Sequence, residues 1–109
     1  NELKKSVNCP IVLTLGAKGS IYLGHNGLLT QIPAFKVKIA DTIGAGDAFT
    51  AGLIYKLIKQ GKVDFFANIK PNMIFASAVS AIICTKKGAN HGLRDIKQVN
   101  SFLAKHLSG

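Results

Sequence analysis

A glycine-rich turn that runs straight into an apolar helical segment sets the tightest limit on the architecture of this chain. The turn spans residues 41–47 (Asp-Thr-Ile-Gly-Ala-Gly-Asp), and the helix-forming segment after it spans 48–57. Small residues at 44–46 let the backbone turn tightly and bring several N–H groups close to a ligand. A helix that begins there adds unpaired amides and the positive end of its dipole. The pattern therefore predicts a phosphate-binding helix N-terminus.

Asp47 is the unusual residue in this turn, because a carboxylate beside a phosphate site repels the phosphate. One role that fits is a general base, which accepts a proton from a hydroxyl that attacks phosphorus. The same helix dipole would keep such a carboxylate ionised. The alternative is that Asp47 only stabilises its own helix from the first turn, a contribution of about 0.3–1 kcal/mol. The tetrapeptide Gly-Ala-Gly-Asp taken alone favours this alternative, and the other motifs of the chain change the balance.

The composition indicates one folded domain with a strongly basic surface. The chain has 109 residues, of which 48% are hydrophobic, which is enough for a core. Fourteen Lys and Arg against five Asp and Glu give a net charge of +9, which is compatible with a polyanionic partner. The basic residues are scattered, however, and Arg94 is the only arginine. We therefore expect no nucleic-acid partner, and a basic nucleic-acid binder is the weakest of the alternatives.

Cysteine and histidine positions give no sign of a disulfide or of a transition metal. Cys9 and Cys84 lie far apart and outside any Cys-x-x-Cys pattern, and the three histidines lack metal-like spacing. This usage fits reduced thiols in a cytoplasmic protein. The longest apolar run, 73–84, is interrupted by serines and is too short to span a bilayer. We expect a buried helix there and no membrane partner.

The first third of the chain is predicted to be β-structure. The apolar run at 11–15 predicts a central parallel strand, because both of its faces would be buried. A turn follows at 16–19. Two further strands, 20–23 and 28–32, are predicted to pair through Asn26-Gly27, which is a strong hairpin signal.

The remaining chain is predicted to form about three helices. The first follows the glycine turn and ends at Gly61. A second helical region covers 65–84 with a break near Pro71, and a regular apolar spacing predicts a last amphipathic helix at 96–107. One or two parallel strands, a hairpin and three helices are the last part of an α/β fold rather than a complete one. We therefore expect that the chain is truncated.

Three segments together resemble the C-terminal part of the ribokinase-like (PfkB) family of carbohydrate kinases. Residues 41–49, followed by Ala51-Gly52, are similar to the second signature of that family. Residues 14–19 are similar to the strand and turn that lie against the nucleotide, and residues 85–89 to the turn that closes the nucleotide and cation sites. The resemblance implies a three-layer α/β/α fold, of which residues 1–109 would be the C-terminal portion of a single domain.

The resemblance also implies an activity and its central residues. The expected reaction is the ATP-dependent, Mg²⁺-requiring transfer of a phosphoryl group to a sugar hydroxyl, as in a fructokinase or ribokinase. Asp47 would be the base. The backbone amides of Ile43, Gly44, Ala45, Gly46 and Asp47 would form the anion hole. Fixed backbone donors suit charge that spreads over the phosphoryl oxygens, since they need not reorganise.

Further contacts follow from the same resemblance. Small residues would line the nucleotide side: Thr14, Gly16, Gly19, Ser77, Ala78 and Gly88. A potassium-type ion would be held by a carboxylate and by backbone carbonyls, at Asp41, Ile43, Ile83, Lys86 and Gly88. At Gly92 the chain departs from relatives that use a serine side chain as a ligand. Structural roles stay open for several of these residues: Asp41 as a turn cap, Gly16 and Gly19 as the strand exit, and Ser77 as a small core residue.

Two other functions remain open from the sequence. One is a kinase of the same fold that acts on a nucleoside or a vitamin-type alcohol. The other is a non-catalytic nucleotide- or phosphate-binding module, in which Asp47 has no chemical role. The sugar-binding residues, the first glycine-rich signature and the lid of such kinases have no counterpart here. We therefore expect the chain alone to be inactive, and uncovered sheet edges and apolar surface to favour a homo-oligomer.

Overall fold

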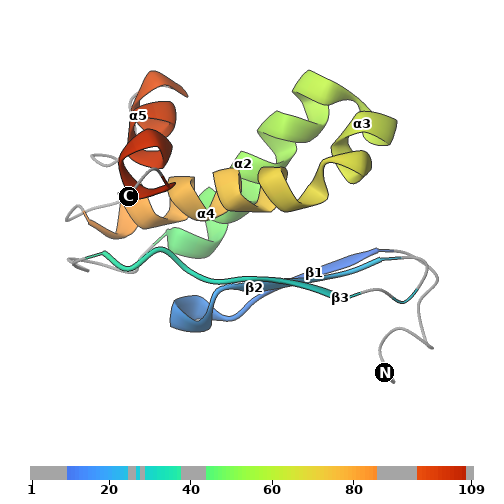
Figure 1. The fold of residues 1–109 in the computed structure, drawn as a ribbon, viewed down its shortest axis with the longest axis horizontal. Coiled ribbons are helices and arrows are strands. Elements are labelled where there is room, and N and C mark those ends of the chain that lie inside the picture. The colour runs from blue at the N-terminus through green and yellow to red at the C-terminus, as the bar shows by residue number, and fades with distance from the viewer. Residues whose placement is uncertain (1–9, 25–26, 28, 38–43, 86–95, 108–109) are drawn as a thin grey trace. The chain divides into compact units, whose positions relative to one another are not determined.

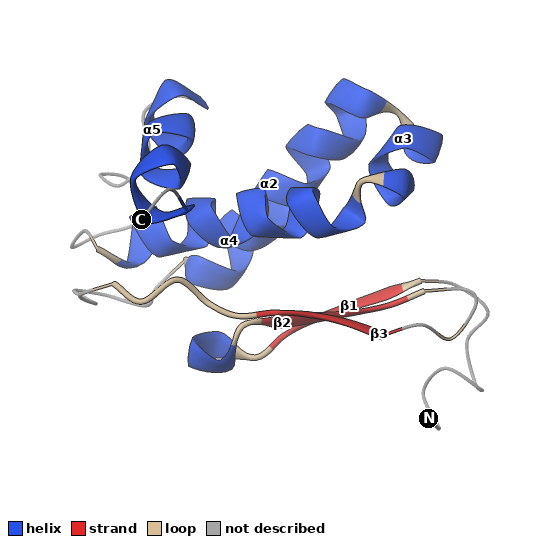
Figure 2. Cartoon of the chain, in the orientation of Figure 1, coloured by secondary structure: helices blue, strands red, loops and turns tan. Residues whose placement is uncertain are grey.

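A three-stranded sheet, a short 3₁₀ helix and four α-helices make up the part of the chain that the computed structural model describes, residues 10–24, 27, 29–37, 44–85 and 96–107 (Figures 1 and 2). The first compact unit covers residues 1–34 and the second covers 35–109. In chain order the elements are β1 (Ile11–Thr14), η1 (Gly16–Lys18), β2 (Ser20–Leu23), β3 (Leu29–Ile32), α2 (Ala45–Gln60), α3 (Lys62–Ala67), α4 (Ile69–Cys84) and α5 (Ile96–Leu107).

The first unit is an antiparallel sheet with β2 in the middle. Its strand order is β1-β2-β3, with Thr14 opposite Ser20 in the first pair and Ser20 opposite Ile32 in the second. The predicted hairpin is confirmed, with β2 at the expected residues and β3 inside the expected range. Asn26 lies outside the described residues, while Gly27 has φ +80°, a value that favours glycine.

The strand β1 differs from its prediction. Among the described residues it pairs only with β2, in the antiparallel direction, so no parallel pair is found there. Leu13 is 46% exposed, so this strand is not buried on both faces. An apolar run shows that a strand can be buried. It shows neither whether a neighbouring strand is present nor in which direction that neighbour runs. The prediction of a buried, parallel strand at 11–15 is therefore wrong for the described sheet.

Glycines set both ends of α2 in the second unit. Gly44 precedes the helix with φ +85°, and Gly61 follows it with φ +84° and donates its N–H to Leu57 O at 2.8 Å. Both values lie in the region that side chains disfavour. The predicted end at Gly61 is confirmed.

The break in the second helical region lies at Asn68, three residues before Pro71. The Asn68 side chain donates to Asp64 O at 2.8 Å, and its own carbonyl accepts from Asn72 N–H at 3.0 Å. Pro71 lies in the first turn of α4, where a missing N–H costs no helical hydrogen bond. The described residues therefore contain four α-helices, one more than expected.

The core of the second unit is formed along α4. Buried side chains of this helix meet Val99 of α5 in one cluster, namely Phe75, Ala78, Val79 and Ile82. The predicted burial of α4 and the amphipathic last helix are both confirmed. The helix α2 packs beside α4 (Figure 1). No helix in the described part of the chain is both long and apolar enough to cross a bilayer.

Gly52 lets α2 and α4 approach closely, and a larger residue there should separate them. A Cβ at Gly52 would lie 3.0 Å from Ala76 Cα and 3.3 Å from Val79 Cγ2. Replacing Gly52 by Val should lower the free energy of unfolding by about 2–3 kcal/mol, because its methyl groups must displace α4. The matched control Ala51→Val, on the exposed side of α2, should cost less than about 1 kcal/mol. Equal denaturation midpoints for the two variants would contradict close packing at Gly52.

Candidate functional site

The predicted glycine turn forms an open helix N-terminus. Gly44 adopts a left-handed conformation (φ +85°, ψ −2°), and among the described residues no side chain caps the helix. The first hydrogen bond of α2 runs from Ala48 N–H to Gly44 O at 2.8 Å. The amides of Ala45, Gly46 and Asp47 precede this bond, and within the described chain no carbonyl accepts from them. Three amide donors at the positive end of a helix suit a phosphoryl group.

Asp47 lies in the first turn of α2 and is exposed. Among the described residues none forms an ion pair or a hydrogen bond with its side chain. Its carboxylate is therefore accessible to a hydroxyl, as a general base must be. Two residues close to the glycine turn hold the N-terminal end of α2 in place. Phe49 is 5% exposed, and Gly52 packs on α4 one turn further along.

Phe35, which precedes the glycine turn in sequence, makes an aromatic contact with α5. The Phe35 ring lies edge-on to the Phe102 ring of α5, with centroids 5.1 Å apart. His106 stacks on Phe102 at 3.9 Å, and its Nδ1 lies 3.0 Å from Phe102 O. Such ring pairs contribute about 0.5–1.5 kcal/mol beyond the area they bury. Asp41 and Ile43 lie between Phe35 and Gly44 in sequence, outside the described residues.

The candidates on α4 are buried to different degrees. Ser77 is 7% exposed and Ile83 is 6% exposed, whereas Ala78 is fully buried within the core cluster. Ala78 thus has a packing role in the second unit. Ile83 belongs to the last turn of α4, where the N–H of the capping residue Thr85 donates toward the carbonyl oxygens of Ala81, Ile82 and Ile83. Lys86 and Gly88, the other candidates near this end, lie outside the described residues.

The first unit contains the residues at the end of β1 and after it that are predicted to line the nucleotide. Thr14 and Gly16 are exposed, and Gly19 is buried. Leu15 N–H donates to Gly19 O at 2.7 Å, and Gly19 N–H donates to Gly16 O at 3.0 Å, which closes the 3₁₀ turn. A Cβ at Gly16 would meet nothing within 4 Å. The surface at Gly16 is therefore open to a ligand.

Gly19 has a structural role that differs from that of Gly16. Its φ is +98°, and a Cβ there would collide with Ile32 O and lie 2.9 Å from Pro33 Cα and Ala34 N. The absent side chain makes room for the backbone that leaves β3. This finding supports the structural interpretation of Gly19 as part of the strand exit.

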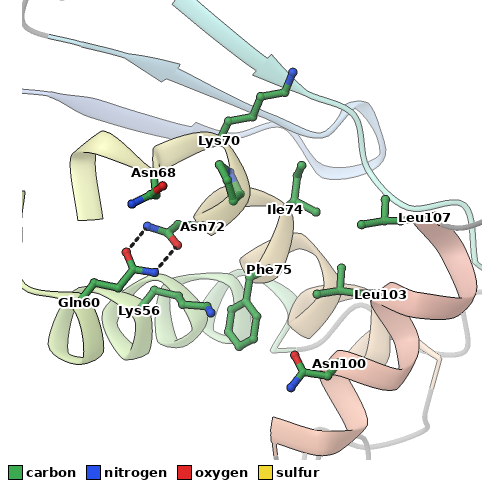
Figure 3. A pocket seen from close by; sticks show the side chains of 11 residues that line it. Lys56, Gln60, Asn68, Lys70, Asn72, Ile74, Phe75, Asn100, Leu103 and Leu107 are labelled. Atoms are coloured by element: carbon green, nitrogen blue, oxygen red, sulfur yellow. Dashed lines mark hydrogen bonds between the residues drawn. The ribbon is translucent and has the colours of Figure 1, made fainter. Parts of the chain in front are cut away.

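Sequence reasoning missed one concave surface of the second unit. Side chains from α2, α4 and α5 surround a hollow of about 430 Å³ (Figure 3), which we call the three-helix hollow. Its α2 residues, Lys56 and Gln60, belong to the half of that helix remote from the glycine turn. No motif could have indicated this hollow, because its lining residues come together only when the helices pack. Among the described residues, no three His, Cys, Asp or Glu side chains form a metal-binding group.

Comparison with known proteins identifies the family to which this chain is similar. Residues 1–96 match the model of the pfkB family carbohydrate kinases. The chain is 34% identical over 96 residues to 1-phosphofructokinase of Haemophilus influenzae. It is 36% identical over 95 residues to aminoimidazole riboside kinase of Salmonella typhimurium. These alignments cover 87% of this chain and 28% and 29% of the respective relatives.

Solved structures agree with the sequence match. The fructokinase of Vibrio cholerae in its fructose-, ADP- and calcium-bound form is 31% identical and superposes with a TM-score of 0.83. The alignment covers 94% of this chain and 33% of that one. The predicted ribokinase-like α/β fold is confirmed by this likeness. Since the family match covers most of the residues, the chain belongs to the pfkB family of carbohydrate kinases.

Proposed function

We propose that the whole protein transfers the γ-phosphoryl group of ATP to a hydroxyl group of a sugar or a riboside. The chain spans about 28% of the length of the curated relatives it matches, so the proposal concerns the whole protein. The observation that carries it is the start of α2. There, three amides precede the first helical hydrogen bond, and the exposed carboxylate of Asp47 lies in the same turn.

In the proposed mechanism, the amides of Gly44, Ala45, Gly46 and Asp47 bind the oxygens of the phosphoryl group in flight. They are held by α2 and do not reorganise as negative charge spreads over those oxygens. Asp47 accepts the proton of the attacking hydroxyl. A new O–P bond forms as the bond between phosphorus and the ADP oxygen breaks, and ADP leaves with that electron pair. ATP supplies the phosphoryl group when it is bound.

The nucleotide and cation contacts remain part of the proposal. The Vibrio cholerae fructokinase was solved with ADP and calcium, and a double mutant of it with ADP and potassium. For this chain we propose Thr14, Gly16 and Ser77 as nucleotide-side residues, with Gly88 beyond the described part. We also propose the carbonyl of Ile83, in the last turn of α4, as a ligand of a potassium-type ion, because hard cations prefer oxygen ligands. Asp41, Ile43, Lys86 and Gly88 complete the proposed cation set, and Mg²⁺ is the expected partner of the ATP phosphates.

The acceptor can be identified by an assay of the intact protein. Fructose, ribose and aminoimidazole riboside, the acceptors that the names of relatives indicate, should be offered with ATP and Mg²⁺ while ADP release is measured. We expect one of them to raise ADP release well above the rate without acceptor. If ADP binds but no acceptor increases turnover, the protein is a nucleotide-binding module instead of a kinase of these alcohols.

A further inference from the structure

The three-helix hollow has the size and the walls of a small-molecule site. Its volume of about 430 Å³ falls in the range of ligand pockets in proteins, roughly 300–1,000 Å³. Eleven residues line it (Figure 3). Ile74 and Phe75 of α4 and Leu103 and Leu107 of α5 provide apolar surface. The hollow is therefore an open depression with an apolar wall.

Most amide groups of the lining are already used within the protein. Gln60 and Asn72 form two mutual hydrogen bonds, from Gln60 Nε2 to Asn72 Oδ1 at 3.0 Å and from Asn72 Nδ2 to Gln60 Oε1 at 2.9 Å (Figure 3). Asn72 Nδ2 also donates to Phe65 O at 3.0 Å, and Asn72 is 2% exposed. Asn68 donates to Asp64 O. These amides are structural, so the charged groups of the lining decide which ligand fits.

The charge of the lining is entirely positive. Lys56 and Lys70 contribute ammonium groups from two different helices, and none of the described lining residues is acidic. The Lys56 Nζ lies 4.4 Å from the centroid of the Phe75 ring, close enough for a cation–π contact. Tyr55 stacks on the same ring at 5.7 Å, which fixes its orientation. Because Lys56 is already held on the apolar wall, less freedom is lost when it binds an anion.

We propose that the three-helix hollow binds a small organic anion, with its carboxylate or phosphate at Lys56 and its apolar body against Ile74 and Leu103. The site is separate from the glycine turn, and no residue of it belongs to the proposed catalytic machinery. A cation bound at this end would meet the Lys56 ammonium group and no carboxylate among the described lining residues. A neutral ligand would leave the positive end of the hollow without a counter-charge.

The test is a titration of the intact protein, labelled with ¹³C at Ile and Leu methyl groups, and followed by NMR. Phenylacetate should shift the methyl resonances of Ile74 and Leu103 saturably, with half-saturation at about 1 mM. Phenylacetamide and phenethylamine, which have a similar shape but no negative charge, should shift them at least about fivefold less at equal concentration. Ile58, which is 79% exposed on α2 and outside the lining, reports non-specific contact.

Substitutions at Lys56 locate the charged end of the ligand. Lys56→Gln should weaken phenylacetate binding about fivefold or more, and Lys56→Arg should retain most of it. The matched control Lys59→Gln removes the same charge from an exposed position outside the lining, and it should leave binding unchanged. Equal shifts with the neutral or cationic analogue, no saturable shift at Ile74, or equal weakening by Lys59→Gln would overturn the proposal. The methyl readout needs no phosphoryl transfer, so its result is independent of the kinase proposal.

Discussion

Replacing Asp47 by Asn in the intact protein should lower kcat for phosphoryl transfer by about 10²–10⁴-fold, because general-base catalysis contributes an acceleration of that size. Asparagine matches the shape of aspartate but cannot take the proton of the attacking hydroxyl. The amides of Ala45 and Gly46 stay in place, so ADP affinity, measured by titration calorimetry, should be preserved. The lost carboxylate should also cost the helix about 0.3–1 kcal/mol of favourable interaction with its dipole.

Asp64 provides the matched control for this experiment. It is an exposed acid in the first turn of α3, as Asp47 is in the first turn of α2. Asp64→Asn makes the same change in charge and should leave kcat unchanged. If both variants retain full turnover and lose the same small amount of stability, Asp47 is only a helix-stabilising acid. Wild-type kcat in Asp47→Asn would therefore remove the base from the proposed mechanism.

Local signals in the sequence were sufficient for several elements. The end of α2 at Gly61 follows from glycine chemistry, since Gly61 has a φ value that side chains disfavour. The last helix follows from its apolar spacing, and the β2–β3 hairpin from the turn between its strands. In each case a few residues close together in sequence determine the local structure, so the sequence is enough to predict it.

Predictions failed where distant or competing groups decide the structure. The direction of pairing at β1 depends on its partner β2, which its own apolar run does not encode. The helix break lies three residues before Pro71, because Asn68 closes α3 with its side chain while Pro71 is tolerated in the first turn of α4. A proline thus marked the neighbourhood of the break without marking its position.

The candidate site divides in the same way. The open amides at the start of α2 were expected from the small residues at 44–46, and the exposed Asp47 carboxylate is compatible with the predicted base. The crowding around Gly19 and the three-helix hollow could not be expected. Both arise from segments far apart in sequence, Gly19 with 32–34 in one case and Lys56 with Phe75 and α5 in the other.

Gly19→Ala should lower the free energy of unfolding by about 2–6 kcal/mol, which combines two separate costs. A non-glycine residue in such a backbone conformation, with φ +98° and ψ −139°, costs about 1–3 kcal/mol. The added methyl group must also displace Ile32 O and its neighbours Pro33 and Ala34, and such overpacking costs about 1–3 kcal/mol more. The measurement is denaturant-induced unfolding of the intact protein, followed by a probe that reports on the β-sheet.

Gly27→Ala separates these two costs. Gly27 also has positive φ, at +80°, but a Cβ there would meet nothing within 4 Å. Gly27→Ala should therefore show only a backbone term, about 1–3 kcal/mol, and a larger loss in Gly19→Ala would come mainly from contact with the segment that leaves β3. Equal losses would mean that this segment yields without cost. In that case Gly19 would be required for its backbone conformation alone, and its burial would say nothing against a ligand approaching the same turn.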